Sequence, residues 1–171
     1  TSLALAAAMV RIGGLAESAA EAHGLAAAAL DEGRALERFR DFVNAQGGEA
    51  QVIDDPGLLP RAAVTRTVAA AVDGFVRSVD ALTVGRASVR LGAGRLRLGD
   101  PVDPAVGIVI EAPVGTRIEQ GEPLAVIHAA TDAAADGAVD EVIGAFDVGE
   151  EPPEKRTTII EELGGPAQDD A

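Results

Sequence analysis

A cluster of helix- and strand-breaking residues, DDPGLLPRA from Asp54 to Ala62, divides this chain into two parts that differ in composition and hydrophobic pattern. Two prolines, a glycine and two aspartates within nine residues end regular structure and are typical of a domain boundary. Alanine-rich helical periodicity precedes the cluster, and short β-prone runs follow it. The sequence therefore predicts an α+β fold, with a helical segment over residues 1–56 and a mostly antiparallel sheet domain over residues 57–163.

Three helices are expected before the cluster, each ending at glycine. Ser2 is the expected N-cap of the first, and the expected ranges are Ser2 to Gly13, Ala16 to Glu32, and Arg34 to Gln46. In the third, Leu36, Phe39 and Val43 share one face.

The second part alternates β-prone runs with turn signals. Val64 to Ala71 and Phe75 to Val79 flank an Asp-Gly pair and predict a β-hairpin. Further expected elements are a helix capped by Asp80, strands over 106–112, 117–118, 124–128 and 157–162, a helix over 131–145, and a disordered tail over 164–171.

Composition excludes several classes of function. The net charge of −14 opposes nucleic-acid binding, because a surface this acidic repels phosphate backbones. The chain has no cysteine, so it has no disulfide, thiolate zinc site or cysteine nucleophile; this is compatible with a cytoplasmic location. The longest apolar run, Leu3 to Val10, is too short to span a bilayer, so no membrane association is expected.

The stretch LGAGRLRLGDPVDPAVG over residues 91–107 is glycine-rich and invites comparison with phosphate-binding loops. The dinucleotide fingerprint needs a third glycine where this chain has Arg97, and it lies between a strand and a following helix. Here the glycines come after a helix, whose last turn presents carbonyls rather than amides. Gly92 and Gly94 are therefore predicted to end a helix, with glycine in the left-handed conformation.

The remaining reactive side chains form no recognised constellation. His23 and His128 have no metal-spaced partner; Asp132 lies four residues after His128 and is a candidate to orient it. No serine lies in a G-x-S-x-G motif. The sequence predicts no catalytic, substrate-binding, phosphate-binding or metal-binding residue in this chain, and no cofactor.

The run VGTRIEQGEPLAVIHA over residues 114–129 has the spacing found in biotinyl and lipoyl domains. Those domains carry their group on a lysine at a hairpin tip. The single lysine here, Lys155, lies far downstream in a Pro-Pro-Glu-Lys segment. We expect the sheet geometry to be shared and the carrier chemistry to be absent.

Taken in order, several segments resemble the C-terminal half of thymidine and pyrimidine nucleoside phosphorylases, over about Leu3 to Glu162. The segments are LDEGRALERFRDFVNAQGGE, DGFVRSVDALTVGRASVRLGAGR, DPVDPAVGIVI and VGTRIEQGEPLAVIHA. The resemblance implies that residues 1–56 are the last helices of an α/β domain and that an α/β-hammerhead-like C-terminal domain follows.

The resemblance also implies a function for a parent enzyme, of which this chain would be a fragment. Such enzymes are homodimers that cleave thymidine or uridine with phosphate as co-substrate, releasing the base and a (deoxy)ribose 1-phosphate. Their phosphate-binding, pyrimidine-binding and cation-binding motifs lie in the N-terminal half and have no counterpart here. The expected partner is that N-terminal half, with Arg95 as the candidate interdomain contact, and this chain alone is expected to be inactive.

Two alternatives remain open at this stage. One is a binding or carrier-like hammerhead module. The other is the C-terminal part of an archaeal-type nucleotide phosphorylase; only the N-terminal half would separate this alternative from a nucleoside phosphorylase, because the resemblance implies that the substrate contacts lie there.

Overall fold

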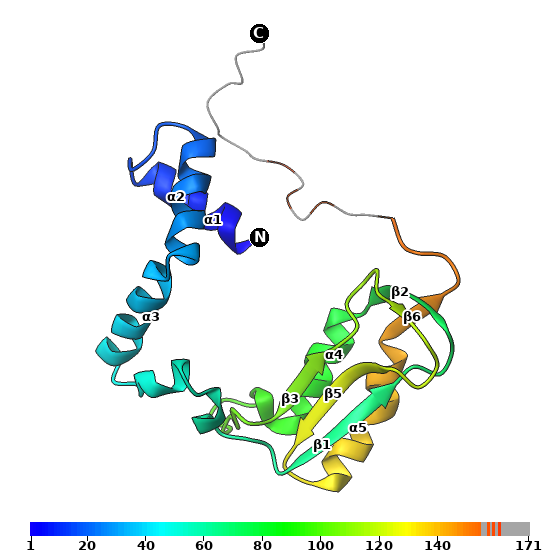
Figure 1. Ribbon diagram of the computed structural model, residues 1–171. Coiled ribbons are helices and arrows are strands. Elements are labelled where there is room, and N and C mark those ends of the chain that lie inside the picture. Colours follow the sequence, from blue (N-terminus) through cyan, green and yellow to red (C-terminus); the bar gives the residue numbers. More distant parts are fainter. Residues whose placement is uncertain (155–156, 158, 160, 162–171) are drawn as a thin grey trace. The chain divides into compact units, whose positions relative to one another are not determined.

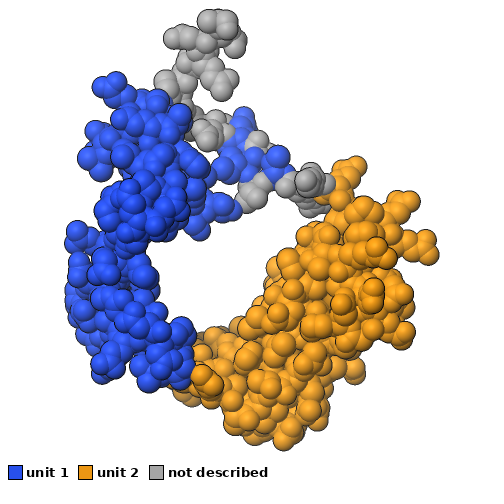
Figure 2. Space-filling view, viewed as in Figure 1, with its two compact units in different colours: residues 1–58, 156–171 blue, residues 59–155 orange. Residues whose placement is uncertain are grey.

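The computed structural model describes residues 1–154, 157, 159 and 161, and it divides the chain into two compact units. Thr1–Leu58 forms the helical unit, and the described residues of Leu59–Lys155 form the α+β unit (Figure 2). The division falls inside the breaker cluster, between Leu58 and Leu59. The predicted strand from Thr157 to Glu162 lies mostly outside the described residues, and the predicted tail over 164–171 lies wholly outside them.

The helical unit consists of three α-helices followed by two short 3-10 turns (Figure 1). They are α1 (Ser2–Ile12), α2 (Ala19–Asp31), α3 (Arg34–Ala45), η1 (Ala50–Ile53) and η2 (Pro56–Leu58). α1 and α2 pack through small side chains: Ala7, Ala16 and Ala22 are buried, with Val10 against them. Alanine contributes little apolar area, so this core is small.

The start of α1 differs by one residue from the prediction. Thr1 is the N-cap, and its carbonyl already accepts the amide of Leu5 at 3.1 Å. Ser2 therefore lies inside the helix, and the prediction that it caps α1 is wrong. Ser18 does act as a cap for α2, since its side chain accepts the amide of Glu21.

The α+β unit contains two three-stranded sheets in which every pairing is antiparallel. One sheet has the order β1-β5-β3 and the other the order β4-β2-β6. The elements in chain order are β1 (Val64–Ala69), β2 (Gly74–Val79), α4 (Ala81–Ser88), η3 (Val89–Ala93), β3 (Gly107–Ile110), β4 (Arg117–Ile118), β5 (Pro123–Ala129), α5 (Asp132–Gly144) and β6 (Phe146–Gly149). The predicted α+β class and mostly antiparallel sheet are confirmed.

One expectation about the strands is wrong, and one strand was not predicted. β1 and β2 do not form a hairpin: β1 pairs with β5, and β2 pairs with β4 and β6. The strand that pairs with β1 lies about 60 residues later in the chain. The connection over residues 70–73 is therefore not a hairpin turn but carries the chain from one sheet to the other. Strand β6 is the strand that the sequence does not predict: its four residues follow α5 after Ala145 alone, so the alternation of Phe146, Asp147 and Val148 is too short to stand out from the end of the helix.

The main core lies between the β1-β5-β3 sheet and the helices α4 and α5. Figure 1 shows the three strands in front of these two helices. Val68, Ile127 and Val142 are fully buried there, and Ala135 and Ala138 let α5 approach the sheet closely. A smaller cluster around Val76, Ile118 and Leu124 joins the second sheet to the first.

The cap of α4 is expected to make that helix sensitive to acid. Asp80 accepts the hydroxyl of Thr83 at 2.6 Å and the amide of Leu82 at 3.0 Å. The Thr83 hydrogen bond, followed by main-chain hydrogen bonds, holds the pKa of Asp80 below its usual value. Because the folded pKa is lowered, this stabilisation is fully present above the unfolded value of about 4 and is lost as the pH falls through the folded value.

Amide hydrogen exchange in α4 measures this effect between pH 6 and pH 3. We expect protection of Leu82 to Val84 to fall in the wild type. In Asp80→Asn it is expected to stay flat, because asparagine caps helices without titrating. Parallel acid loss in both proteins would contradict the role of the carboxylate.

Candidate functional site

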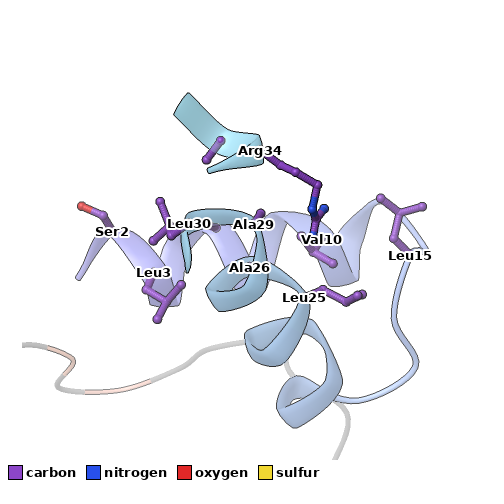
Figure 3. Close-up of a pocket in the computed structure, with 11 residues that line it drawn as sticks. Ser2, Leu3, Val10, Leu15, Leu25, Ala26, Ala29, Leu30 and Arg34 are labelled. Carbon is purple, nitrogen blue, oxygen red and sulfur yellow. The ribbon is translucent and has the colours of Figure 1, made fainter. Parts of the chain in front are cut away.

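The helical unit contains an apolar groove with a volume of about 640 Å³. We call it the helical groove. It runs between α1, α2 and the start of α3 (Figure 3). Its lining residues are Ser2, Leu3, Ala6, Val10, Leu15, Leu25, Ala26, Ala29, Leu30, Arg34 and Ala35.

The helical groove offers almost no reactive chemistry. Its polar side chains are those of Ser2 and Arg34, and the Arg34 guanidinium is paired with Glu32 at 2.8 Å. Neither a histidine nor a carboxylate lines it, so it provides neither a general base nor an activated nucleophile. The groove suits contact with another apolar surface and not a reaction.

The apolar face of α3 extends this uncovered surface. No residue of α3 is buried. Leu36 is 50% and Phe39 53% exposed, so the face that the sequence predicts for these residues is largely uncovered within the described residues. Phe42, which the sequence reasoning missed, is 58% exposed and stacks on Phe39 with ring centroids 6.5 Å apart. Its position three residues after Phe39 was the available signal.

The glycine-rich stretch folds as a closed loop after a helix end. Gly92 has φ +111°, and its carbonyl accepts the amide of Asp103 at 3.0 Å. The helix therefore ends at these glycines as predicted, and carbonyls rather than amides face the loop. The Asp100 carboxylate accepts the amide of Arg97 at 2.7 Å, and Arg95 Nε donates to the carbonyl of Asp100 at 3.2 Å. The loop is thus built on its own hydrogen bonds.

Arg95 has a local role in that loop, which leaves part of its guanidinium for other partners. Only its Nε donates within the loop. The predicted contact of Arg95 with a neighbouring α/β domain stays a prediction.

The two histidines do not come together. His23 is exposed on α2, and His128 lies in β5, in the other unit. The candidate partner of His128 is engaged elsewhere: Asp132 accepts from Arg66 at 3.0 Å, and Asp136 binds the same guanidinium at 2.9 Å. Asp132 therefore binds Arg66 and does not act as the candidate partner of His128.

Strand geometry explains why. Ile127 and Ala129 are buried in the core that contains α5. Since successive side chains of a strand point to opposite faces, His128 projects away from α5 and from Asp132. Arg66, which shares a face with Ile127, points toward α5 instead.

Metal and membrane signals are absent from the described residues. No group of three or more His, Asp or Glu side chains there has the geometry to hold a metal ion. Within the same residues, no helix combines the length and apolar character that crossing a bilayer requires.

Comparison with known proteins gives one consistent family. Residues 75–148 match the model of the pyrimidine nucleoside phosphorylase C-terminal domain. These residues run from β2 to β6 and include most of the α+β unit.

Individual relatives extend the similarity into the helical unit. A thymidine phosphorylase of Burkholderia cenocepacia is 45% identical over 150 residues, which is 87% of this chain and 34% of the relative. A thymidine phosphorylase of Rhizobium meliloti is 36% identical over 94% of this chain and 37% of the relative. A pyrimidine-nucleoside phosphorylase of Staphylococcus aureus is 42% identical over 74% of this chain and 29% of the relative.

The chain therefore spans about a third of the length of these relatives. The domain match and the relatives agree with the order of motifs along the sequence. Over residues 75–148 the chain carries the C-terminal domain of the pyrimidine nucleoside phosphorylases, and over most of its length it is similar to a part of thymidine and pyrimidine-nucleoside phosphorylases.

Proposed function

We propose that this chain is the C-terminal part of a phosphorylase that cleaves thymidine or another pyrimidine nucleoside. The reaction uses inorganic phosphate and releases the base and a (deoxy)ribose 1-phosphate. Similarity that continues through both units, from α1 to beyond β6, supports this assignment. The names of the relatives support the substrate class.

In this proposal the chain supports the reaction and does not perform it. Phosphorolysis needs convergent donors or cations for phosphate and for the departing pyrimidine anion. In the described residues, the helical groove is apolar and the glycine-rich loop is closed on itself. The phosphate and nucleoside sites would belong to the upstream part of the enzyme.

The helical groove and the exposed face of α3 are then the contact surface for that upstream part. Large apolar side chains lie exposed on all three helices, including Met9, Leu30 and Phe42. Exposed apolar side chains beside an apolar groove are typical of an interaction site. The homodimer, the use of phosphate as co-substrate and the cytoplasmic location belong to the same proposal.

Split-enzyme complementation tests the proposed function. The chain is mixed with the upstream part of the Burkholderia cenocepacia relative, and thymine release from thymidine is followed with and without phosphate. We expect neither part alone to release thymine and the mixture to do so only with phosphate. Phosphate-dependent turnover by this chain alone would contradict the proposal that the substrate sites lie in the upstream part. An inactive mixture would contradict the proposal that this chain is the C-terminal part of such a phosphorylase.

A charge in the helical groove is expected to weaken this complementation. Leu30→Arg places a guanidinium where the proposed contact is apolar, and Ala20→Arg places the same charge on an exposed position of α2 outside the lining set. We expect Leu30→Arg to raise the half-saturating concentration of the chain roughly tenfold or more, because an unpaired charge is buried on docking. Equal effects of the two variants would show that the groove is not the contact.

Arg95→Ala tests the remaining candidate contact. If Arg95 touches the neighbouring domain, the variant is expected to lower complementation activity while the thermal unfolding midpoint of the chain changes little, since the loop keeps the Arg97–Asp100 hydrogen bond. Unchanged activity would remove this residue from the interface.

A further inference from the structure

The β1-β5-β3 sheet has one face that its own unit covers only at one end, where Leu124 packs in the cluster with the second sheet. Val68, Ala125, Ile127 and Ala129 point into the core under α4 and α5. The alternate positions form the opposite face, and we call the part of it away from Leu124 the open sheet face. Its members are Thr65, Thr67, Gly107, Val109, Val126 and His128.

Register brings these residues into one patch. His128, on the central strand, is paired with Thr65 on one side and Gly107 on the other. The next row of the same face is formed by Thr67, Val126 and Val109. Thr65, Thr67 and Val109 are exposed, and Val126 and His128 are half-buried.

The charge of the open sheet face differs from that of the chain. The chain carries 28 acidic and 14 basic residues among its 171. None of the six positions of this face is a carboxylate, a lysine or an arginine. A neutral patch on a chain of net charge −14 complements a neutral, largely apolar partner and offers little to a strongly charged one.

The shape of the surface around His128 depends on its neighbours on the two adjacent strands. At Gly107, no heavy atom lies within 4 Å of the position where a Cβ would stand. The imidazole is therefore flanked by the Thr65 side chain on one side and by an open position on the other. This arrangement accepts an apolar side chain above Gly107, with the imidazole and the threonine hydroxyls as hydrogen-bonding groups at its edge.

The size of the patch restricts the kind of partner. Three strands about 4.8 Å apart and rows about 3.4 Å per residue give an area of only about 200–300 Å². A stable complex between separate proteins needs about 800 Å² per partner. A patch this small holds a partner only when another contact already keeps that partner close.

We infer that the open sheet face, centred on His128, is a second docking surface for the upstream part of the phosphorylase, against a neutral and largely apolar region of it. The inference rests on the proposed function, in which the helical groove supplies the first contact. The two surfaces then hold the upstream part to both units of this chain.

Two matched variants of the chain test this surface in the complementation assay. Thr65→Arg with Thr67→Arg places two guanidinium groups on the open sheet face, on exposed positions of the edge strand β1. Ala133→Arg with Gly137→Arg places the same two charges on exposed positions of α5, on the helix side of the sheet. Circular dichroism melting of each chain shows whether the variants keep their fold.

The face variant is expected to raise the half-saturating concentration roughly tenfold or more, and the α5 variant less than about twofold. In the active wild-type mixture, amide hydrogen exchange of β1 and β5 is expected to slow relative to the free chain. An active wild-type mixture with equal effects of both variants and unchanged exchange would overturn this inference and leave the proposed function standing. An inactive wild-type mixture would overturn both. If the face variant melts early, the hydrogen exchange of the wild type decides.

Discussion

Replacing Ile127 with alanine is expected to lower the free energy of unfolding of the α+β unit by about 2–5 kcal/mol. Ile127 lies at the centre of β5, the middle strand of its sheet, and is fully buried. It packs in the cluster that joins the sheet to α4 and α5. The loss has two causes: apolar area is no longer removed from water, and the rigid surroundings leave a cavity.

Ile110→Ala provides the matched control for this prediction. Ile110 lies on the same face of the same sheet, in β3, but it is 36% exposed. The surroundings of Ile110 can relax into solvent, so we expect a smaller loss. The chain has neither tryptophan nor tyrosine, so hydrogen exchange of the β5 amides in urea is the suitable measurement. Equal losses in the two variants would contradict the assignment of Ile127 to the core.

Replacing Gly74 with alanine is expected to destabilise the β4-β2-β6 sheet by about 1–3 kcal/mol. A Cβ at Gly74 would lie 2.7 Å from the carbonyl oxygen of Gly149 and 2.9 Å from Cγ1 of Val148. The nearest atom belongs to the backbone of β6, so it cannot rotate away. Strand β6 would have to move, and its pairing with β2 would weaken.

The same substitution at Gly137 is expected to have the opposite sign. Gly137 lies inside α5, and no heavy atom lies within 4 Å of the position of its Cβ. Alanine there is expected to stabilise the unit by about 0.5–1 kcal/mol, because glycine loses more backbone freedom when the helix forms. Thermal melting of both variants checks the pair. A destabilised Gly137→Ala or an unaffected Gly74→Ala would contradict the packing described for these positions.

Local signals predicted the helices well. Gly33 begins α3 in the left-handed conformation, Asp80 caps α4, and the side chain of Thr131 accepts the amide of Ala134 at the start of α5. Caps and glycine ends act within one turn, so a short stretch of sequence is enough to specify them. The cap of α1 shifts by one residue, from Ser2 to Thr1, and α2 begins at Ala19 rather than at the expected Ala16.

The pairing of the strands was harder to predict from the sequence. The Asp73-Gly74 pair suggested a hairpin, yet Asp73 serves a different contact: its carboxylate accepts the amide of Gln120 at 2.7 Å. That hydrogen bond joins residues 47 positions apart, and no nearby pattern encodes it. The choice between a hairpin and a connection between two sheets depends on which distant strands bury the most apolar surface.

The candidate surfaces also differ in how far the sequence predicts them. The face of Leu36 and Phe39 follows from helical periodicity, and the motif order in residues 75–129 indicates the family. By contrast, the helical groove joins residues of three helices, and the open sheet face joins three strands from residue 65 to residue 128.

The sequence by itself determined the α+β class, most helix ends, the family resemblance, and a break within residues 54–62, because each depends on neighbouring residues or on the order of motifs. Only the tertiary structure decided which strands pair, that Asp132 binds Arg66 and not His128, and which apolar faces stay uncovered. The physical reason is that strand pairing and burial depend on segments far apart in the chain. Alternative pairings compete, and the one that forms is the one in which all the segments pack together best.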